Sequence, residues 1–315
     1  MRQRKPAIGF SLAALAALFF VINAGVSSVA LRAHVRPETL TTVRVTGTAL
    51  ALLGYCLLFR RSALALPRGR DALLLVGLGV VGVAALQWAY FVAIDRLPVG
   101  MALLLEYQAP ILVALWARFV QREPVRPRLW AGLALAWLGL AAATGIWNGV
   151  AFDSTGMVAG LLAAVCFAAY FLIGEAGVSS TDPLRVVLWS FVVASVVMNL
   201  VHPVTELPAS RLRYSADLLG SLSGGHAPVW LVLAWVVLLG TLLPFAAELA
   251  AMQHLKATTV TLVAMLEPIG VNALGWAWFG QSLGAVAVVG VFAVVAGVLL
   301  AQSARTTLVE PPTLT

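Results

Sequence analysis

Long apolar runs separated by short polar breaks make up most of the chain. Apolar runs of about 18 residues or more predict membrane-spanning helices. The breaks carry turn-forming or charged residues, for example Arg36-Pro37 and Asp182-Pro183. We therefore expect ten spanning helices, at about residues 8–30, 39–59, 72–94, 98–119, 129–148, 156–176, 183–204, 229–253, 257–279 and 283–303.

Composition supports this interpretation. The chain is 61% hydrophobic and 10% charged, whereas soluble domains are about 25% charged. Arg2, Arg4 and Lys5 before the first apolar run would also fit a secretory signal peptide. That run extends over about 24 residues, longer than a usual signal core, and nine further runs follow it. We expect a multi-pass membrane protein that has no soluble domain.

Positive charge is distributed unevenly over the breaks. If the N-terminus is cytoplasmic, 14 of the 20 Lys and Arg residues fall on the cytoplasmic side and five on the outer side. Because cytoplasmic loops are enriched in Lys and Arg, we expect both termini in the cytoplasm. The net charge of +7 follows from this bias and gives no reason to expect nucleic acid as a partner.

The two parts of the chain resemble each other. A shift of 158 residues places Gly82 on Gly240, Pro110 on Pro268, Gly132 on Gly290 and Gly139 on Gly297. Five spans per copy is an odd number, so the second copy must cross the membrane in the opposite direction, as in many secondary transporters. We predict an all-α polytopic membrane protein with ten transmembrane helices as two inverted five-helix repeats. The repeats should cover residues 1–150 and 151–305, followed by a short tail at 306–315, with Glu206–Pro228 as an external loop.

Three glutamates interrupt the apolar runs and are the leading functional candidates. Glu106 and Glu267 lie beside prolines in the related segments LEYQAP and MLEPIG, and Glu248 lies in the eighth run. An ionisable group at the bilayer centre costs about 2.5–3.5 kcal/mol unless it faces a cavity or a partner. We expect Glu106 and Glu267 to face one cavity and to bind substrate or protons. The structural alternative is a carboxyl group bonded to backbone that the proline has freed.

Weaker candidates surround these positions. Glu248 lies nearer the cytoplasmic end of its span, where its side chain could reach water. Arg44 could be the counter-charge of a carboxylate, or it could extend to the outer interface. Gln87, Tyr90 and Tyr107 would suit a cavity for an amphipathic ligand, although aromatic residues in spans more often pack.

Other motifs point to no additional chemistry. Residues 77–82 fit the dinucleotide pattern G-x-G-x-x-G but lie inside a spanning run without the required strand. The four histidines are scattered, and Cys56 and Cys166 lie inside spans. The chain also lacks a paired nucleophile and base. We therefore expect no metal, cofactor, disulfide or catalytic residue, and we interpret the protein as a non-enzyme.

The chain resembles the EamA-type transporters of the drug/metabolite transporter superfamily. The resemblance covers nearly the whole chain and is carried by residues 96–115, with LE-x-x-x-P, and by residues 243–281, with LEP. It is most similar to the threonine and homoserine exporter branch. The Gly-Glu pair that this family carries after spans four and nine is replaced here by Arg122-Glu123 and Gly280-Gln281.

The resemblance implies a carrier of the bacterial inner membrane that exports small polar or amphipathic metabolites, with amino acids as the leading expectation. A membrane-buried carboxyl group can be stabilised by a proton or by an ammonium group. Glu106 or Glu267 could thus exchange a proton for the substrate. The alternative cargoes are lipid-linked substrates, nucleotide sugars and drugs, and a homodimer is left open. The expected partners are the substrate, the lipid bilayer and protons.

Overall fold

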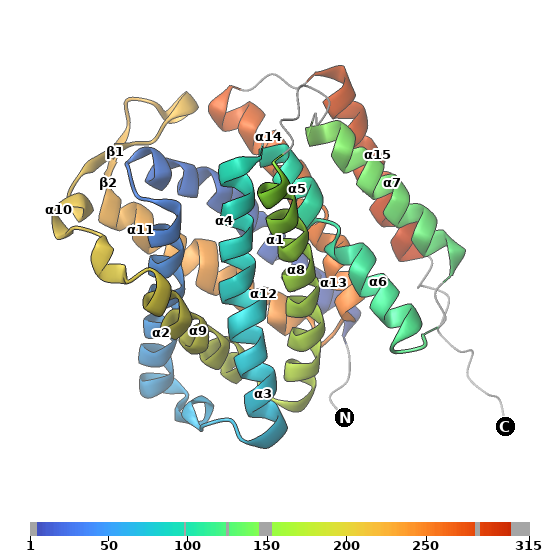
Figure 1. Cartoon of the computed structure of the whole chain (residues 1–315), viewed down its shortest axis with the longest axis horizontal. Coiled ribbons are helices and arrows are strands. Elements are labelled where there is room, and N and C mark those ends of the chain that lie inside the picture. The colour runs from blue at the N-terminus through green and yellow to red at the C-terminus, as the bar shows by residue number, and fades with distance from the viewer. Residues whose placement is uncertain (1–4, 98, 124–125, 145–152, 281–283, 304–315) are drawn as a thin grey trace.

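The computed structural model describes residues 5–97, 99–123, 126–144, 153–280 and 284–303. Within these residues, nine apolar helical segments are long enough to span a membrane, and a shorter tenth covers Pro127–Ala143. The chain is thus a polytopic helical protein, as the apolar runs predicted (Figure 1).

The first five spans occupy residues 6–144. They are α1 (Pro6–Arg32), α2 (Pro37–Phe59), the continuous α3 (Gly69–Gly77), η2 (Leu78–Ala85) and α4 (Leu86–Arg96), the broken pair α5 (Val99–Glu106) and α6 (Ala109–Phe119), and α7 (Pro127–Thr144). A short helix, η1 (Arg61–Leu64), follows α2.

The second five spans occupy residues 154–303. They are α8 (Ser154–Ser180), α9 (Pro183–Val201), the continuous α11 (Val229–Val237), η5 (Leu238–Leu242) and α12 (Leu243–Ala251), the broken pair α13 (Ala257–Ala264) and α14 (Glu267–Phe279), and α15 (Ala285–Ser303). Prolines begin α1, α2, α7 and α9. Proline suits the first helical turn, where its missing N–H would have no partner.

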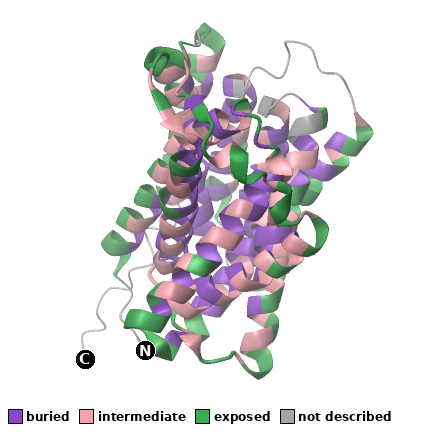
Figure 2. Ribbon diagram, turned by 90° about the vertical axis from the view of Figure 1, so that its left-hand side faces the viewer, coloured by how far each residue is buried: buried purple, intermediate pink, exposed green. Residues whose placement is uncertain are grey.

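The segment between α9 and α11 is more ordered than the loop that the sequence predicted. It contains η3 (Val204–Glu206), α10 (Ala209–Leu212), η4 (Gly220–Leu222) and an antiparallel hairpin of β1 (Ser215–Asp217) and β2 (His226–Pro228). We call the end of the bundle that carries this hairpin the hairpin end. The opposite end, where α1 begins and α15 finishes, is the tail end (Figure 2).

Irregular turns recur at equivalent places in the two repeats. The π-helical segments η2 and η5 overlap after the shift of 158 residues. The breaks in the fourth and ninth spans coincide under the same shift, because α5 and α13, and then α6 and α14, begin at equivalent residues. π-Bulges and proline kinks are identifiable causes of helix bending. Regular α-helix is therefore interrupted at the same two places in both repeats.

The last spans of the repeats, α7 and α15, pack against each other through glycines. A Cβ at Gly132 would lie 2.5 Å from the Gly297 carbonyl oxygen, and one at Gly139 would lie 2.7 Å from that of Gly290. The shift of 158 residues converts each of these pairs into the other. Small residues let membrane helices approach closely, so the glycines that revealed the repeat are those that let α7 and α15 meet.

The first span of each repeat packs into the other repeat. α1 packs on α11, α12 and α14, whereas α8 packs on η2, α4, α5 and α6. Equivalent glycines permit this exchange: Gly82 approaches Tyr170 of α8, and Gly240 approaches Asn23 of α1. The two repeats are interleaved in space. The predicted boundary near residue 150 falls among 145–152, outside the described residues.

Aromatic rings fill the core near the middle of the bundle. The Phe245 ring meets Phe20 and Phe191 at centroid distances of 5.2 Å and Tyr170 at 5.6 Å, all nearly edge-to-face. Edge-to-face aromatic pairs stabilise beyond their buried area. Phe245 thereby ties α1, α8 and α9 to α12, one turn before Glu248.

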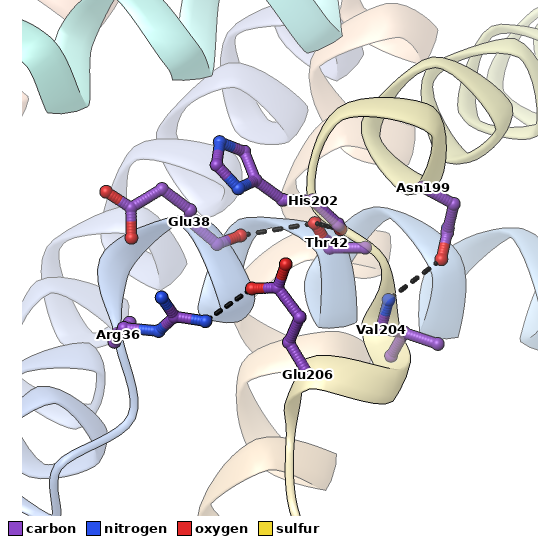
Figure 3. A network of polar contacts seen from close by, with 7 residues as sticks. All are labelled: Arg36, Glu38, Thr42, Asn199, His202, Val204 and Glu206. Carbon is purple, nitrogen blue, oxygen red and sulfur yellow. Dashed lines mark hydrogen bonds and ion pairs between the residues drawn. The ribbon is translucent and has the colours of Figure 1, made fainter.

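Polar contacts join α2 to α9 at the hairpin end (Figure 3). The Thr42 hydroxyl contacts the His202 carbonyl oxygen at 2.8 Å, and the Asn199 side chain accepts from the Val204 backbone N–H at 3.0 Å. Arg36 forms an ion pair with Glu206. The Thr42–His202 bond and the Arg36–Glu206 pair connect the start of α2 to the end of α9 and to η3, and the Asn199–Val204 bond fixes the turn between α9 and η3.

Candidate functional site

The breaks in the fourth and ninth spans place backbone polar groups in the middle of the bundle. Proline has no N–H, so Pro110 removes the usual helical partner of the Glu106 carbonyl, and Pro268 does the same for Ala264. Glu106 is the last residue of α5 and Glu267 the first of α14. Both acidic side chains thus lie beside a break. The position of Glu267 at a helix N-terminus also favours negative charge there.

Glu267 is the centre of an acidic cluster. The Tyr107 hydroxyl donates a hydrogen bond of 3.0 Å to Glu267 Oε2. Glu267 also interacts electrostatically with Glu248 and with Glu106. The three glutamates predicted from the sequence therefore lie close together, and they come from both repeats.

Glu248 lies deeper than the sequence suggested. Its exposed fraction is 3%, because α12 is covered by α1 and α9 and also contacts α8. The Tyr170 hydroxyl faces the Glu248 carboxyl group, although the two do not form a well-aligned hydrogen bond. The expectation that Glu248 reaches water at the end of its span is wrong in this structure.

Arg44 also points inward. Its exposed fraction is 8%, and its Nε donates a 3.0 Å hydrogen bond to the Thr241 hydroxyl in η5. The alternative that Arg44 extends to the membrane interface is therefore wrong here. Thr241 in turn donates to the Val236 carbonyl at 2.7 Å, across the π-helical turn. The bulge in the eighth span thus supplies the acceptor that holds Arg44.

Tyr90 links the cation to the acidic cluster. It interacts electrostatically with both Arg44 and Glu106, and Tyr107 interacts with Tyr90 and with Glu106. Gln87 is half-buried on α4, and its spacing of three residues puts it on the Tyr90 face. The structure thus joins Arg44, Tyr90, Tyr107 and the glutamates, with Gln87 at the margin.

Accessibility differs on the two sides of the cluster. Glu106 and Glu267 are only half-buried although they lie in the middle of spans. Toward the tail end, all eight residues of α13 are buried. Toward the hairpin end, only Pro268 and Gly275 of the 13 residues of α14 are buried. In the ninth span, the residues on the tail side of Glu267 are thus buried, whereas most of those on the hairpin side are not.

An apolar cavity lies away from the cluster. It measures about 510 Å³ and is lined by apolar side chains of α2, α11 and the segment after α9, among them Gly47, Leu207 and Trp230. With no ionisable lining group, it does not suit a polar substrate. Within the described residues, no group of three His, Cys, Asp or Glu side chains is arranged to hold a metal ion.

Two members of the cluster were not predicted. Tyr170 lies mid-span in α8, where its ring resembles ordinary packing, and Thr241 is one of many small polar residues. A usable signal was that the chain has only five tyrosines, three of which, Tyr90, Tyr107 and Tyr170, belong to this cluster.

Ten spanning segments in two inverted repeats around central ionisable groups are an architecture typical of membrane transporters. The chain belongs to the EamA-like transporter family, whose profile matches residues 7–145 and 154–302. The predicted family resemblance is thereby confirmed, and the protein is a multi-pass membrane transporter.

Individual relatives agree with this assignment. The chain is 27% identical to the threonine/homoserine exporter RhtA of Salmonella typhimurium (strain SL1344), over 72% of this chain and 69% of the exporter. RhtA of Escherichia coli (strain K12) is 26% identical over 69% of this chain and 66% of the exporter. An uncharacterized transporter of Archaeoglobus fulgidus is 26% identical over 84% of this chain and 86% of that protein.

A solved crystal structure shares the fold. It superposes with a TM-score of 0.73 at 20% sequence identity, covering 95% of this chain and 96% of the other. At that identity the likeness concerns the fold.

Proposed function

We propose that this protein is an alternating-access carrier of the bacterial inner membrane that exports small amino acids. The observation that carries the proposal is the arrangement around Tyr90, which lies near both Arg44 and Glu106 in the middle of the bundle. An amino acid is a zwitterion. Arg44 would take its carboxylate, and Glu106 or Glu267 its ammonium group.

The composition of the cluster supports this assignment. Arg44 is buried and has no ion pair with an acidic side chain among the residues described. A buried charge is costly unless it is paired, so a substrate carboxylate would supply the missing partner. Three carboxyl groups in one low-dielectric site likewise call for a cation, which a substrate ammonium group or a proton would provide.

Aromatic and amide groups would complete the site. Tyr107 and Tyr170 offer hydroxyl groups, and Gln87 offers both a donor and an acceptor. Threonine and homoserine each carry a side-chain hydroxyl that could bond to such groups. The names of the exporter relatives point to the same substrates.

The tail end would face the cytoplasm, since 14 of the 20 Lys and Arg residues fall on that side. The dense packing of α13 would then close the cytoplasmic path, and the structure would represent an outward-facing state. The helix interruptions shared by the two repeats would serve as hinges. Exchange of the repeats between their two shapes would open the opposite side.

Proton exchange would supply the driving force. Inward movement of one charge is worth about 2.3 kcal/mol per 100 mV, which supports a substrate gradient of roughly fiftyfold. The glutamate cluster would carry the proton in one direction and the ammonium group in the other.

Transport in proteoliposomes tests the proposal. Radiolabelled L-threonine and L-homoserine should accumulate by counterflow, and an imposed proton gradient should drive net movement. A channel would fail to show counterflow. If the reconstituted protein moves neither amino acid but moves a lipid-linked substrate, a nucleotide sugar or a drug from the same panel, the amino-acid assignment is wrong.

A further inference from the structure

A second polar cavity lies at the tail end, between the two repeats. It measures about 270 Å³ and lies between α6, α8 and α13. Its polar lining consists of Gln121, Glu123, Glu175, Ser179, Lys256 and Thr258. We call it the tail pocket. Its wall contains two acids and one cation, so it can offer an opposite charge to each end of a zwitterion.

One wall of the tail pocket contains an ion pair between the repeats. Lys256, just before α13, pairs with Glu123, just after the fourth span. The two side chains are 45% and 31% exposed. Such exposed pairs contribute little to stability and are screened by salt. A ligand that carries both charges could therefore displace this pair.

Thr258 provides an independent sign of a missing ligand. Its residue is 6% exposed, it lines the tail pocket, and its hydroxyl has no hydrogen-bond partner within the described part of the chain. Most buried polar side-chain atoms have such a partner. A polar ligand in the pocket would supply one.

Two apolar residues of the tail pocket lie on helices that also reach the central cluster. Val113 lies one turn after Ala109, where α6 begins at the break, and Leu172 lies on α8, the helix that carries Tyr170. The tail pocket and the central cluster therefore share two helices.

The sequence makes the two ends of the carrier chemically different. Under the shift of 158 residues, Glu123 corresponds to Gln281 and Lys256 to Pro98. Neither Gln281 nor Pro98 can form an ion pair. The Glu123–Lys256 pair therefore belongs to the tail end alone and is not a feature that the repeat supplies twice.

We propose that the tail pocket is a loading site for a zwitterionic amino acid. The ligand's ammonium group binds Glu123 and Glu175, and its carboxylate binds Lys256 and the Thr258 hydroxyl. Binding separates Glu123 from Lys256 and frees the two loops, so the tail end opens when cargo is present. The inference rests on the proposed function, because it takes the same substrate class.

Transport kinetics measured separately from the tail side and from the hairpin side test the loading site. Thr258→Val and Glu175→Gln remove ligand contacts but keep the Glu123–Lys256 pair. Each should raise the half-saturating L-threonine concentration at the tail side about tenfold, because each removes one hydrogen bond to a charged group of the ligand. The half-saturating concentration at the hairpin side and the maximal rate should change by no more than about twofold, because neither substitution alters the central cluster. Thr41→Val, at a buried threonine bonded within α2, is the matched control. Equal effects on both sides, or none, would overturn the loading site.

Protection from labelling separates this site from the central one. Ser179 is exposed at the pocket wall, so Ser179→Cys in a background without Cys56 and Cys166 gives a reporter thiol. L-threonine should slow its reaction with a maleimide, and it should do so equally when Glu106→Gln and Glu267→Gln disable the central cluster.

The outcomes distinguish the two proposals. Protection without any L-threonine transport by the unmutated carrier would leave the tail pocket standing and remove the proposed function. Transport without protection would do the reverse. Protection that vanishes with the central variants would also overturn the loading site, because it would then report a shape change driven from the centre.

Discussion

Replacing Arg44 should remove the carrier's recognition of the substrate carboxylate. Arg44 is 8% exposed and is held by one 3.0 Å hydrogen bond to Thr241, with no acidic partner among the described residues. A hydrogen bond to a charged group is worth about 1.5–3 kcal/mol, or roughly ten- to hundredfold in binding. We expect Arg44→Gln to lower the transport efficiency for L-threonine by that factor.

Comparison of two substrates makes the assay specific. L-threonine amide keeps the ammonium and hydroxyl groups but has no carboxylate. The unmutated carrier should prefer L-threonine by roughly ten- to hundredfold, since the amide leaves Arg44 unpaired. Arg44→Gln should erase that preference, whereas Arg44→Lys, which keeps the charge but loses the planar fork, should retain part of it.

The control is Arg211→Gln, at an arginine of α10 that stacks over Tyr214 outside the bundle centre. It should leave the preference unchanged. If Arg44→Gln folds normally and still prefers L-threonine over its amide as strongly as the unmutated carrier does, Arg44 does not bind the substrate carboxylate. The proposed role of Arg44 in binding an amino acid would then be wrong.

Three further predictions concern the helix packing, the central cluster and the topology. Gly139→Leu should strongly reduce the amount of folded protein in detergent, because its Cβ would lie 2.6 Å from the backbone of α15. Gly54→Leu should be tolerated, because a Cβ there has no neighbour within 4 Å. Equal yields of the two variants would contradict the packing of α7 on α15. Tyr107→Phe, which removes the 3.0 Å hydrogen bond to Glu267, should weaken substrate binding by about tenfold at unchanged abundance, and unaltered binding would contradict a role for this hydroxyl. A cysteine at Ser221 in a background without other cysteines should react with an impermeant thiol reagent in intact cells. Labelling only after the cytoplasmic side is opened would show that the predicted topology is wrong.

The fold was predictable because the features that indicate it lie in continuous stretches of the sequence. Runs of apolar residues fix the spans, and prolines at Pro37, Pro127 and Pro183 begin helices in the structure. The odd number of spans per repeat requires inversion. The hairpin of β1 and β2 was not predictable, because strands of three residues are too short to show an alternating pattern.

The central site was predictable only in part. A glutamate inside an apolar run is conspicuous, so Glu106, Glu248 and Glu267 could be named from the sequence. The side that Arg44 faces depends on how α2 is rotated against η5, and the π-helical turn that presents Thr241 has no sequence signature. The burial of Glu248 likewise depends on α1 and α9 covering α12. Contacts of this kind arise from packing between distant segments.

The most direct test of the central claim compares net export with exchange in Glu106→Gln and Glu267→Gln. Glutamine keeps the shape and most hydrogen bonds of glutamate but removes its charge. At least one variant should lose net L-threonine export while its membrane abundance stays near that of the unmutated carrier, and a variant that lacks only the proton-carrying group should retain exchange of internal for external substrate. If both variants export at the unmutated rate under an imposed proton gradient, the central carboxylates do not drive transport.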